Sequence, residues 1–420
     1  MLPSRRSPTR PAATAEPGAT SASTPTSAPT PAPRVLLLRP AKARPDAARQ
    51  LAAVVAGLQA GGAEVTQLTP GGPGGPDDQQ ARNEPAGRRG SPDRPARQGL
   101  DLAGRCRSAW ETATHARALG PLDSVVVGQV DLALTGLVTA RLTGASRVPV
   151  LFHGVDMWTM RRHLRLLLRH DPLLCPVTTS SFGAGALSPT RMGAVIPPGL
   201  DHRWREALLT EAARRRPLPP VPTVLTVFPL DEWEAKGLPT LVGALDTLHA
   251  PVPAEAPDDA GGTAGPVRLV IAGAGPAPGS LHALIAGREH TDLFEDPSDE
   301  ELARLYATAD LFALCTRTRT RSPVSGESHP TALLEAQLAG CAVIGPAQGG
   351  SRDAYQRGVT GWTPTDESSP ALARVLADLL ADRARLARAG RLASDWARAV
   401  TDPDDHSQAV FAALLGRQRS

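Results

Sequence analysis

The stretch from Gly326 to Gly350 reads GESHPTALLEAQLAGCAVIGPAQGG and carries two acids, Glu327 and Glu335, that are eight residues apart. The second acid lies inside an apolar run, residues 331–339, which has good helix propensity throughout. An ordinary amphipathic helix with a solvated Glu335 would explain either acid alone. The argument for function therefore depends on the whole string and on what surrounds it.

The residues on either side of this run mark where the helix begins and ends. Pro330 is pre-organised for a first helical position, and Ser328 or His329 stands where a cap would be. Gly340 ends the helix, and residues 341–344 form a short apolar strand. Free backbone N–H groups and the helix dipole make such an N-terminus an anion site. The segment therefore predicts a loop, an anion-binding helix N-terminus, a helix and a buried strand.

The whole string resembles the Glu-x7-Glu signature of retaining GT-B glycosyltransferases of the family 4 type, which use nucleotide-sugar donors. The resemblance implies that Glu327 lies beside the donor sugar and that Glu335 binds the ribose hydroxyls. It also implies that loop amides meet the diphosphate, and the Gly349-Gly350 pair fits the same family pattern. The predicted donor-binding stretch before Glu335 comprises Ser328, His329, Pro330, Thr331 and Ala332.

Lysine is scarce in this chain. Lys42 and Lys236 are the two lysines among 45 basic residues, so a lysine here is more informative than usual. The family binds the donor diphosphate through a Gly-Arg pair and a later Lys-Gly pair, and Lys236-Gly237 matches the second. We expect Lys236 to bind the donor and to take part in catalysis, whereas Lys42 and Arg44 are more typical of a solvated surface.

The Gly-Arg pair itself is missing, because Phe228-Pro229 stands in its place. One of two cations that would stabilise the departing diphosphate is therefore absent, and no other side chain reproduces the bidentate fork of arginine. Arg317, Arg319 and Arg321 in the loop before Glu327 are candidates to replace it from the other side.

Strands and helices alternate along both halves of the chain, which predicts parallel sheets. The resemblance implies a GT-B fold, with two facing Rossmann-like domains, an interdomain cleft and C-terminal helices that cross back. The expected parts are a disordered tail at 1–33, an acceptor domain at 34–198 with a mobile insertion at 71–100, a linker at 199–222, a nucleotide-sugar domain at 223–395 that holds a second insertion at 251–266, and closing helices at 396–420.

Two further motifs lie at predicted strand ends. Residues 148–152 form a strand that delivers His153, and ligands bind at the carboxyl edge of open parallel sheets. The family has a histidine here on the acceptor side, so we assign His153 as a catalytic residue and expect Asp156 to orient its loop. Gly273 and Gly275 resemble a turn of the family that lets backbone approach the nucleotide, although Gly-x-Gly alone is weak.

Residues 157–170 read as one helix with an arginine stripe at Arg161, Arg165 and Arg169 opposite Leu164, Leu167 and Leu168. A basic amphipathic helix can touch anionic lipid, and some members of the family do so. The apolar face is narrow and lacks aromatic residues. We therefore favour a helix packed on the core with a solvated arginine face, and peripheral membrane contact is the less favoured interpretation.

Composition limits the remaining possibilities. The 420 residues suffice for two domains, and a net charge of +3 is too small to argue for nucleic acid. The four cysteines have no metal or redox spacing, which fits free thiols in the cytoplasm. No run of 18 apolar residues occurs. We expect no cofactor and no metal, with the diphosphate charge neutralised by protein groups.

The sequence therefore predicts a retaining transfer of a hexosyl or related group from a nucleotide sugar to a small-molecule, lipid or glycan acceptor. The missing Gly-Arg pair leaves open an inactive or pseudo-glycosyltransferase relative that binds a nucleotide sugar, a cyclitol or a partner enzyme. A GT-B epimerase is less favoured, because the resemblance continues through both halves. The joint presence of Lys236, Glu327, Glu335 and His153 favours catalysis.

Overall fold

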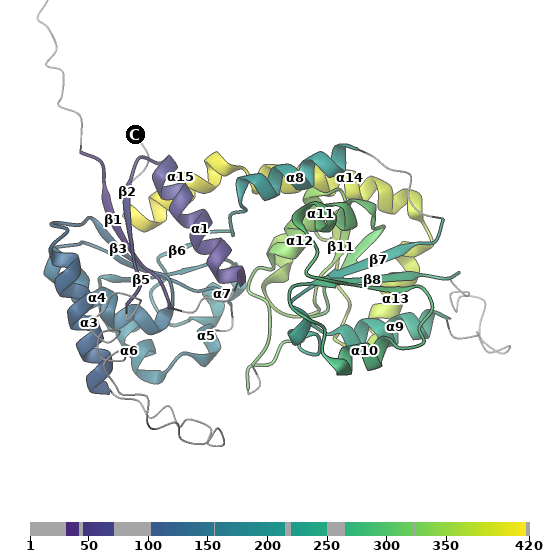
Figure 1. Ribbon diagram of the computed structural model, residues 1–420, viewed down its shortest axis with the longest axis horizontal. Coiled ribbons are helices and arrows are strands. Elements are labelled where there is room, and N and C mark those ends of the chain that lie inside the picture. Colours follow the sequence, from purple (N-terminus) through teal and green to yellow (C-terminus); the bar gives the residue numbers. More distant parts are fainter. Residues whose placement is uncertain are drawn as a thin grey trace, which may run out of the picture. The chain divides into compact units, whose positions relative to one another are not determined.

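The computed structural model describes residues 31–41, 45–70, 102–154, 156–214, 220–249, 265–321 and 324–416. The expected insertion at 71–100, nearly all of the tail at 1–33 and most of the insertion at 251–266 lie outside the described residues, as do Lys42 and Arg44. The described chain contains two parallel sheets with helices on both faces (Figure 1). We call each sheet with its covering helices a lobe, the first and the second in chain order.

The sheet of the first lobe has six parallel strands in the order β2-β1-β3-β4-β5-β6. Their bounds are β1 Arg34–Leu38, β2 Glu64–Leu68, β3 Ser124–Val127, β4 Val148–Leu151, β5 Leu174–Thr178 and β6 Ala194–Val195. The strand order reverses between β1 and β3, which are neighbours. Such a switch point opens a crevice at the carboxyl ends of the strands, where ligands bind in open α/β sheets.

Alternate residues of β1 pack on opposite faces of the first sheet, as the pleat of a strand requires. Val35 and Leu37 join a core with α1 (Pro45–Ala60) and α15 (Pro403–Leu415). Leu36 and Leu38 join the other core, under the remaining helices. These are α3 Leu102–Arg117, α4 Ala133–Thr143, α5 Asp156–Thr159, α6 Arg162–His170 and α7 Ser181–Ala186.

The sheet of the second lobe also has six parallel strands, in the order β12-β11-β10-β7-β8-β9. Their bounds are β7 Thr223–Val227, β8 Arg268–Gly273, β9 Thr291–Glu295, β10 Leu311–Ala313, β11 Ala342–Ile344 and β12 Gly361–Trp362. Counted from β7, the strands follow the order of the dinucleotide-binding fold, with the switch point between β7 and β10.

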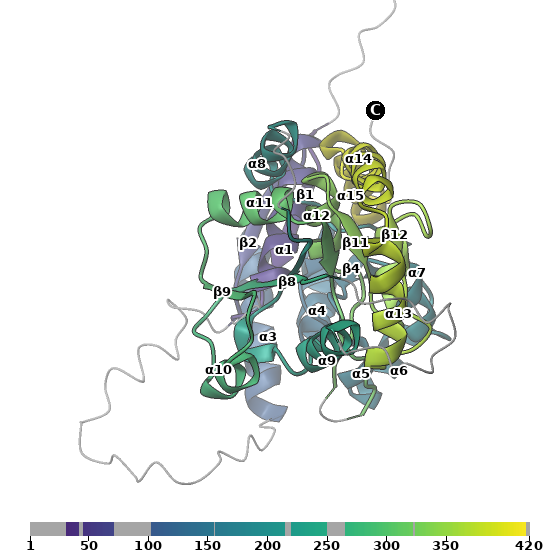
Figure 2. The same cartoon turned by 90° about the vertical axis from the view of Figure 1, so that its right-hand side faces the viewer.

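Helices cover both faces of the second sheet. Figures 1 and 2 show α9, α10 and α13 on one side and α11 and α12 on the other. Val224 and Leu225, adjacent in β7, pack into these two different cores. The helices are α8 His202–Ala213, α9 Leu238–His249, α10 Gly279–Ile285, α11 Asp299–Thr308, α12 Thr331–Leu338, α13 Ser369–Leu380 and α14 Arg383–Val400.

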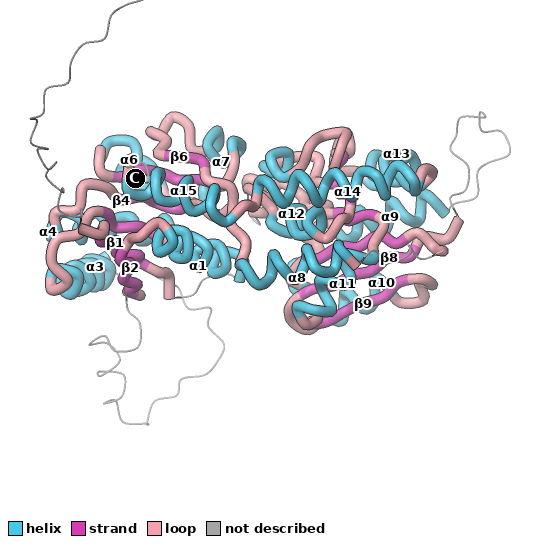
Figure 3. The backbone as a smooth tube through the Cα atoms, turned by 90° about the horizontal axis from the view of Figure 1, so that it is seen from above, coloured by secondary structure: helices cyan, strands magenta, loops and turns pink. Residues whose placement is uncertain are grey.

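The C-terminal helix returns to the first lobe, as the predicted fold requires. In Figure 3, α15 follows α14 and lies beside α1. Ser407 donates a hydrogen bond to the carbonyl oxygen of Gly57 in α1, and Ser124 of β3 donates one to that of Leu414. The crossing falls at Thr401, after α14, rather than at residue 396, since α14 still packs on α12 and β11.

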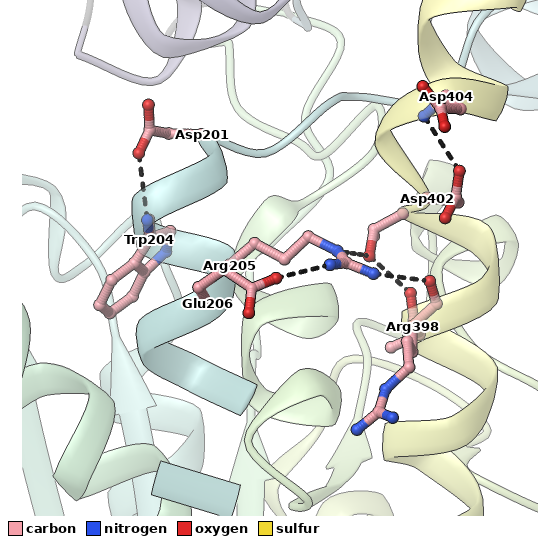
Figure 4. Close-up of polar contacts among 9 residues, drawn as sticks. Asp201, Trp204, Arg205, Glu206, Arg398, Asp402 and Asp404 are labelled. Carbon is pink, nitrogen blue, oxygen red and sulfur yellow. Dashed lines mark hydrogen bonds and ion pairs between the residues drawn. The ribbon is translucent and has the colours of Figure 1, made fainter. Parts of the chain in front are cut away.

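The expected linker at 199–222 contains a helix, which was not predicted because the segment ends in a proline-rich run. Asp201 caps α8 by accepting the backbone N–H of Trp204. Arg205 is buried and ties α8 to the end of α14, donating to the carbonyl oxygen of Arg398 and the hydroxyl of Thr401 (Figure 4). The two segments that connect the lobes are therefore joined to each other.

The single helix expected at 157–170 is wrong, because the backbone breaks into α5 and α6. Arg161 is extended, with ψ of 147°, and acts as the N-cap residue of α6. Arg165 donates to the carbonyl oxygen of Met157, so an arginine side chain supplies a hydrogen bond to a carbonyl group of the short helix α5. The expected packing of α6 holds, since Leu164 and Leu168 are buried in the core.

Candidate active site

Lys236 and Glu327, which are 91 residues apart, meet in the second lobe. The Nζ of Lys236 donates to Oε1 of Glu327 at 2.7 Å, and the hydroxyl of Thr316 donates to the same oxygen at 2.8 Å. The two charged side chains are 15% and 12% exposed. Lys236 follows β7 and Thr316 follows β10, so the pair lies at the carboxyl ends of the strands at the switch point.

Glycines allow the three backbones around this pair to approach. Gly237 has φ of 77°, and a Cβ there would overlap the carbonyl oxygen of Cys315. The N–H of Gly350 donates to the carbonyl oxygen of Glu327 at 2.8 Å, and a Cβ added at Gly350 would overlap the carbonyl oxygen of Ser328. The Lys-Gly and Gly-Gly pairs of the sequence are therefore steric requirements of this arrangement.

The helix that follows Glu327 begins without a side-chain cap. Pro330, with φ of −72° and ψ of 116°, is the N-cap residue, so the expected cap by Ser328 or His329 is wrong. Ser328 instead shares hydrogen bonds with the hydroxyls of Thr179 at 3.1 Å and Ser180 at 3.2 Å in the first lobe. In the described chain no side-chain acceptor satisfies the first N–H groups of α12, which keeps this terminus suited to an anion.

The loop residues predicted to bind the donor differ in exposure. Ser328, His329 and Pro330 are buried, whereas Thr331 and Ala332 are half-buried. Burial lowers the pKa of His329 to about 4, although the charge of Asp353 opposes the shift. The imidazole of His329 is therefore neutral at pH 7 and contributes packing rather than positive charge.

Glu335 lies one turn into α12 and is 5% exposed. Its Oε2 accepts a hydrogen bond from the fully buried hydroxyl of Tyr306 in α11 at 3.0 Å. Burial raises the pKa of Glu335, and the positive charge of Arg49 on α1 opposes that shift. Sequence reasoning missed Tyr306 as a partner of this carboxylate, because a tyrosine in a helix is most often a core residue.

Gly273 and Gly275 lie at the exit of β8, at the same edge of the second sheet. A Cβ on Gly273 would overlap the carbonyl oxygen of Phe228, so the glycine is needed for chain packing. Gly275 has φ of 85° and open space where its Cβ would be, and its N–H donates to Asp296 at 2.7 Å. Of the two, Gly275 has open space beside it, and its approach to the nucleotide stays a prediction.

The position of the missing arginine is filled by core packing. Phe228 is buried among apolar residues, and neither Phe228 nor Pro229 carries a cationic side chain. Arg317, one of the candidates to replace the arginine, donates to the hydroxyl of Thr240, while its neighbour Thr316 binds Glu327. A guanidinium has five N–H donors, more than this one bond uses, so Arg317, Arg319 and Arg321 all stay predictions.

His153 lies at the end of β4, in the first lobe. Its Nδ1 is 2.7 Å from Oε1 of Gln50, and its Nε2 is 3.0 Å from the carbonyl oxygen of Gly128. The backbone N–H groups of His153 and Gly154 donate to the carboxylate of Asp156, which therefore orients this loop as expected. Sequence reasoning missed Gln50, which looks like any polar residue of an amphipathic helix.

Thr179 connects the two halves of the site. It lines a small recess with His153, and its hydroxyl bonds Ser328, the residue after Glu327. Ser181, two residues on, donates its N–H to the carboxylate of Asp353 at 2.7 Å. The loop of the second lobe that precedes α12 thus contacts the turn that adjoins His153.

The described residues offer no evident metal site. Nowhere in that part of the chain do three His, Cys, Asp or Glu side chains group as metal ligands would. Asp402 and Asp404 have Asp-x-Asp spacing, but Asp402 caps α15 by accepting the N–H of Asp404 (Figure 4). Among the described helices, none has the length and apolarity needed to span a bilayer.

Solved structures share the arrangement of the two lobes. A glycosyltransferase from Rickettsia africae matches with a TM-score of 0.65 at 16% identity, covering 92% of this chain and 96% of that one. HepE of Anabaena, in complex with UDP-glucose, matches with a TM-score of 0.62 at 16% identity, covering 91% and 100%. At identities this low, the structural likeness shows the fold alone. The fold places the protein in the GT-B class.

Sequence relatives narrow the class to a family. Residues 224–396 match the family model for glycosyl transferases group 1. A GDP-mannose-dependent alpha-(1-6)-phosphatidylinositol monomannoside mannosyltransferase of Mycobacterium tuberculosis is 32% identical over 274 residues, which are 62% of this chain and 67% of the relative. A putative colanic acid biosynthesis glycosyltransferase of Salmonella typhimurium, WcaL, is 26% identical over 245 residues, 55% of each chain. The chain belongs to the group 1 glycosyl transferases and is a glycosyltransferase.

Proposed function

We propose that the protein transfers a hexosyl group, with retention of configuration, from a nucleoside diphosphate sugar to an acceptor held by the first lobe. One observation carries the proposal, which is the Lys236–Glu327 pair beside the uncapped start of α12. An ammonium group and a helix N-terminus both attract a diphosphate, and neither needs a metal.

Each predicted residue has a role in this proposal. The ammonium of Lys236 has three donors, so it can hold Glu327 and a phosphate oxygen at once. Together with the first amides of α12 it stabilises the charge that develops on the departing diphosphate. Glu327 lies by the anomeric centre, and Glu335, held by Tyr306, accepts the ribose hydroxyls.

The relatives support a nucleoside diphosphate hexose as donor. The Mycobacterium relative is named for its dependence on GDP-mannose, and the Anabaena neighbour was solved with UDP-glucose. The sequence relative is the more similar of the two, so GDP-mannose is the first donor to test. The acceptor class stays open among small molecules, lipids and glycans. The cysteines Cys175, Cys315 and Cys341 are unpaired, which supports a reducing compartment such as the cytoplasm.

Release of nucleoside diphosphate from a panel of nucleotide hexoses tests the proposal. We expect one donor to be consumed, with Lys236→Ala lowering kcat/KM roughly 10²- to 10³-fold because a preorganised cation is lost. Arg391→Ala, which removes a charge from the exposed face of α14, serves as the matched control and leaves the rate unchanged. Full activity of Lys236→Ala would contradict the assigned role.

Two further measurements complete this test. The anomeric configuration of the product, followed by NMR, matches that of the donor if the transfer is retaining. Activity persists in excess EDTA if charge neutralisation is done by protein groups alone. The buried Phe228 favours one competing function, a relative that binds donors without transferring them. A donor that raises the melting temperature but releases no nucleoside diphosphate would support that function instead.

A further inference from the structure

The imidazole of His153 is enclosed by groups from separate parts of the first lobe. Gln50, on α1, is 103 residues away in sequence and 8% exposed, and its Oε1 faces Nδ1 at 2.7 Å. The carbonyl oxygen of Gly128, just after β3, faces Nε2 at 3.0 Å. Both distances lie within the range of good hydrogen bonds, so the ring has a defined orientation.

The carbonyl of Gly128 determines the state of one ring nitrogen. A carbonyl oxygen can only accept, so the Nε2 that faces it must carry a proton. This backbone is firmly held, since the N–H of Gly128 donates to the carbonyl oxygen of Leu38 at 2.9 Å. The Nε2 of His153 therefore has no lone pair with which to take a proton from a substrate.

The amide oxygen of Gln50 makes the same demand on the other nitrogen. In the orientation that the structure gives this amide, its Oε1 faces the ring and accepts from Nδ1, and an imidazole with protons on both nitrogens carries a positive charge. The counter-charge is Asp156, whose carboxylate accepts two backbone N–H groups of the same loop. Burial raises the pKa of Asp156 and the charge of His153 opposes that shift, as in an ion pair.

We propose that Gln50 is a positioning residue that keeps His153 protonated on both nitrogens, so that His153 serves the site as a fixed cation and not as a general base. The inference deepens the proposed function and rests on it for the catalytic consequence. Besides Asp156, His406 of α15 lines the same recess as the ring, and Arg49, next to Gln50 on α1, acts on Glu335.

A cation at this place has a clear use. Phe228-Pro229 supplies no arginine to the donor diphosphate, so Lys236 is the single cation of the two expected. An imidazolium at His153 adds positive charge in the first lobe. The turn at Thr179, whose hydroxyl contacts that of Ser328, joins this part of the first lobe to the loop that follows Glu327. Preorganised charge of this kind lowers the barrier to diphosphate departure.

NMR of the full chain with ¹⁵N-labelled histidine tests the protonation state without any substrate. The signal of His153 is assigned by its loss in His153→Asn. We expect both ring nitrogens to carry protons near pH 7 in the wild type. In Gln50→Leu the second proton is lost at a lower pH, whereas Gln50→Glu retains it to a higher pH because a carboxylate accepts more strongly. Gln59→Leu, on the exposed face of the same helix, is the matched control.

Kinetics then tests the consequence. Gln50→Leu lowers kcat about tenfold with little change in donor KM, Gln50→Glu restores most of the loss, and Gln59→Leu has no effect. A single ring proton on wild-type His153 at pH 7, or a spectrum unchanged in Gln50→Leu, overturns the proposal. Unchanged kcat in Gln50→Leu overturns the positioning role. Failure of every donor would refute the proposed function, yet the NMR result would still decide the state of His153.

Discussion

The second lobe brings chain segments together at glycines, whereas the first lobe holds the His153 side chain between groups from separate segments. Around Glu327, chain segments approach because Gly237 and Gly350 have no Cβ. Around His153, the approach is made by an amide and a carboxylate, those of Gln50 and Asp156. Glycine pairs are visible in the sequence, whereas the contact between His153 and Gln50, 103 residues away, is not.

The largest expected effect comes from adding a methyl group where backbones touch. Gly350→Ala places a Cβ on the carbonyl oxygen of Ser328, and we expect it to lower the free energy of unfolding by about 3 kcal/mol or more. Gly128→Ala, the corresponding change beside His153, meets the Leu38 carbonyl oxygen at 2.9 Å and costs about 1–2 kcal/mol. Urea denaturation measures both.

Gly185→Ala is the control for this pair of changes. Gly185 lies in α7, and no atom is within 4 Å of the position that the added methyl group would take, so alanine stabilises by up to about 1 kcal/mol. Equal losses at Gly350 and Gly128 would show that the contrast between the lobes is false.

A second effect follows from the buried histidine of the donor loop. His329 has a pKa of about 4 in the folded protein against 6.5 as its ordinary value. The unfolded chain therefore takes up a proton first, and folding loses about 3 kcal/mol as the pH falls from about 6.5 through 4. Stability is unaffected by this group above pH 6.5, where both states are neutral.

The difference between wild type and His329→Gln isolates this effect. Urea midpoints of the two proteins should converge as the pH falls, because the variant cannot take up the proton. His406, whose pKa burial also lowers, is common to both proteins and cancels. Curves that stay parallel from pH 7 to 4 would mean that His329 is charged or exposed in the fold.

The smallest effect is expected at Tyr306. Tyr306→Phe removes one hydrogen bond from the buried Glu335, which costs about 1–2 kcal/mol and raises the donor KM about tenfold with kcat little changed. A donor lacking a ribose hydroxyl sharpens the test. If Tyr306 acts through Glu335, wild type discriminates against that donor and the variant does so less. Equal discrimination would reduce Tyr306 to a core residue.

Periodicity in the sequence was enough for most of the fold. The helix predicted at 331–339 is observed as α12, and the strands predicted at 341–344 and 148–152 are observed as β11 and β4. Strong apolar runs with clear stops fix such elements because burial on a sheet is their main stabilisation.

Elements with mixed signals were missed, for identifiable reasons. Helix α8 begins at a capping aspartate, but the arginine and proline run after it suggested a linker. Strand β9 lies at the edge of its sheet and is only half-buried, so its apolar pattern is weak. The break at Arg161 depends on a bond from Arg165 to the α5 carbonyl, which no periodicity encodes.

In the candidate site, too, some residues could be predicted from sequence motifs and others depend on the folded geometry. Lys236 and Glu327, which the motifs assigned to one site, lie in contact, and their roles stay predictions. The partners that hold the site together are separated from the residues they contact, by 103 residues for Gln50, 29 for Tyr306 and 11 for Thr316. Their identity depends on the folded geometry, which a single sequence without homologues does not express.

The scarcity of lysine has a practical consequence for this enzyme. Among 420 residues a reagent that acylates primary amines meets two lysine side chains, and one of them is Lys236, in hydrogen-bond contact with Glu327. Surface labelling, which in most proteins reports on dozens of scattered positions, becomes here a nearly site-directed probe. The preference of this chain for arginine thus makes the ammonium group of Lys236 one of two lysine amines that such a reagent can reach.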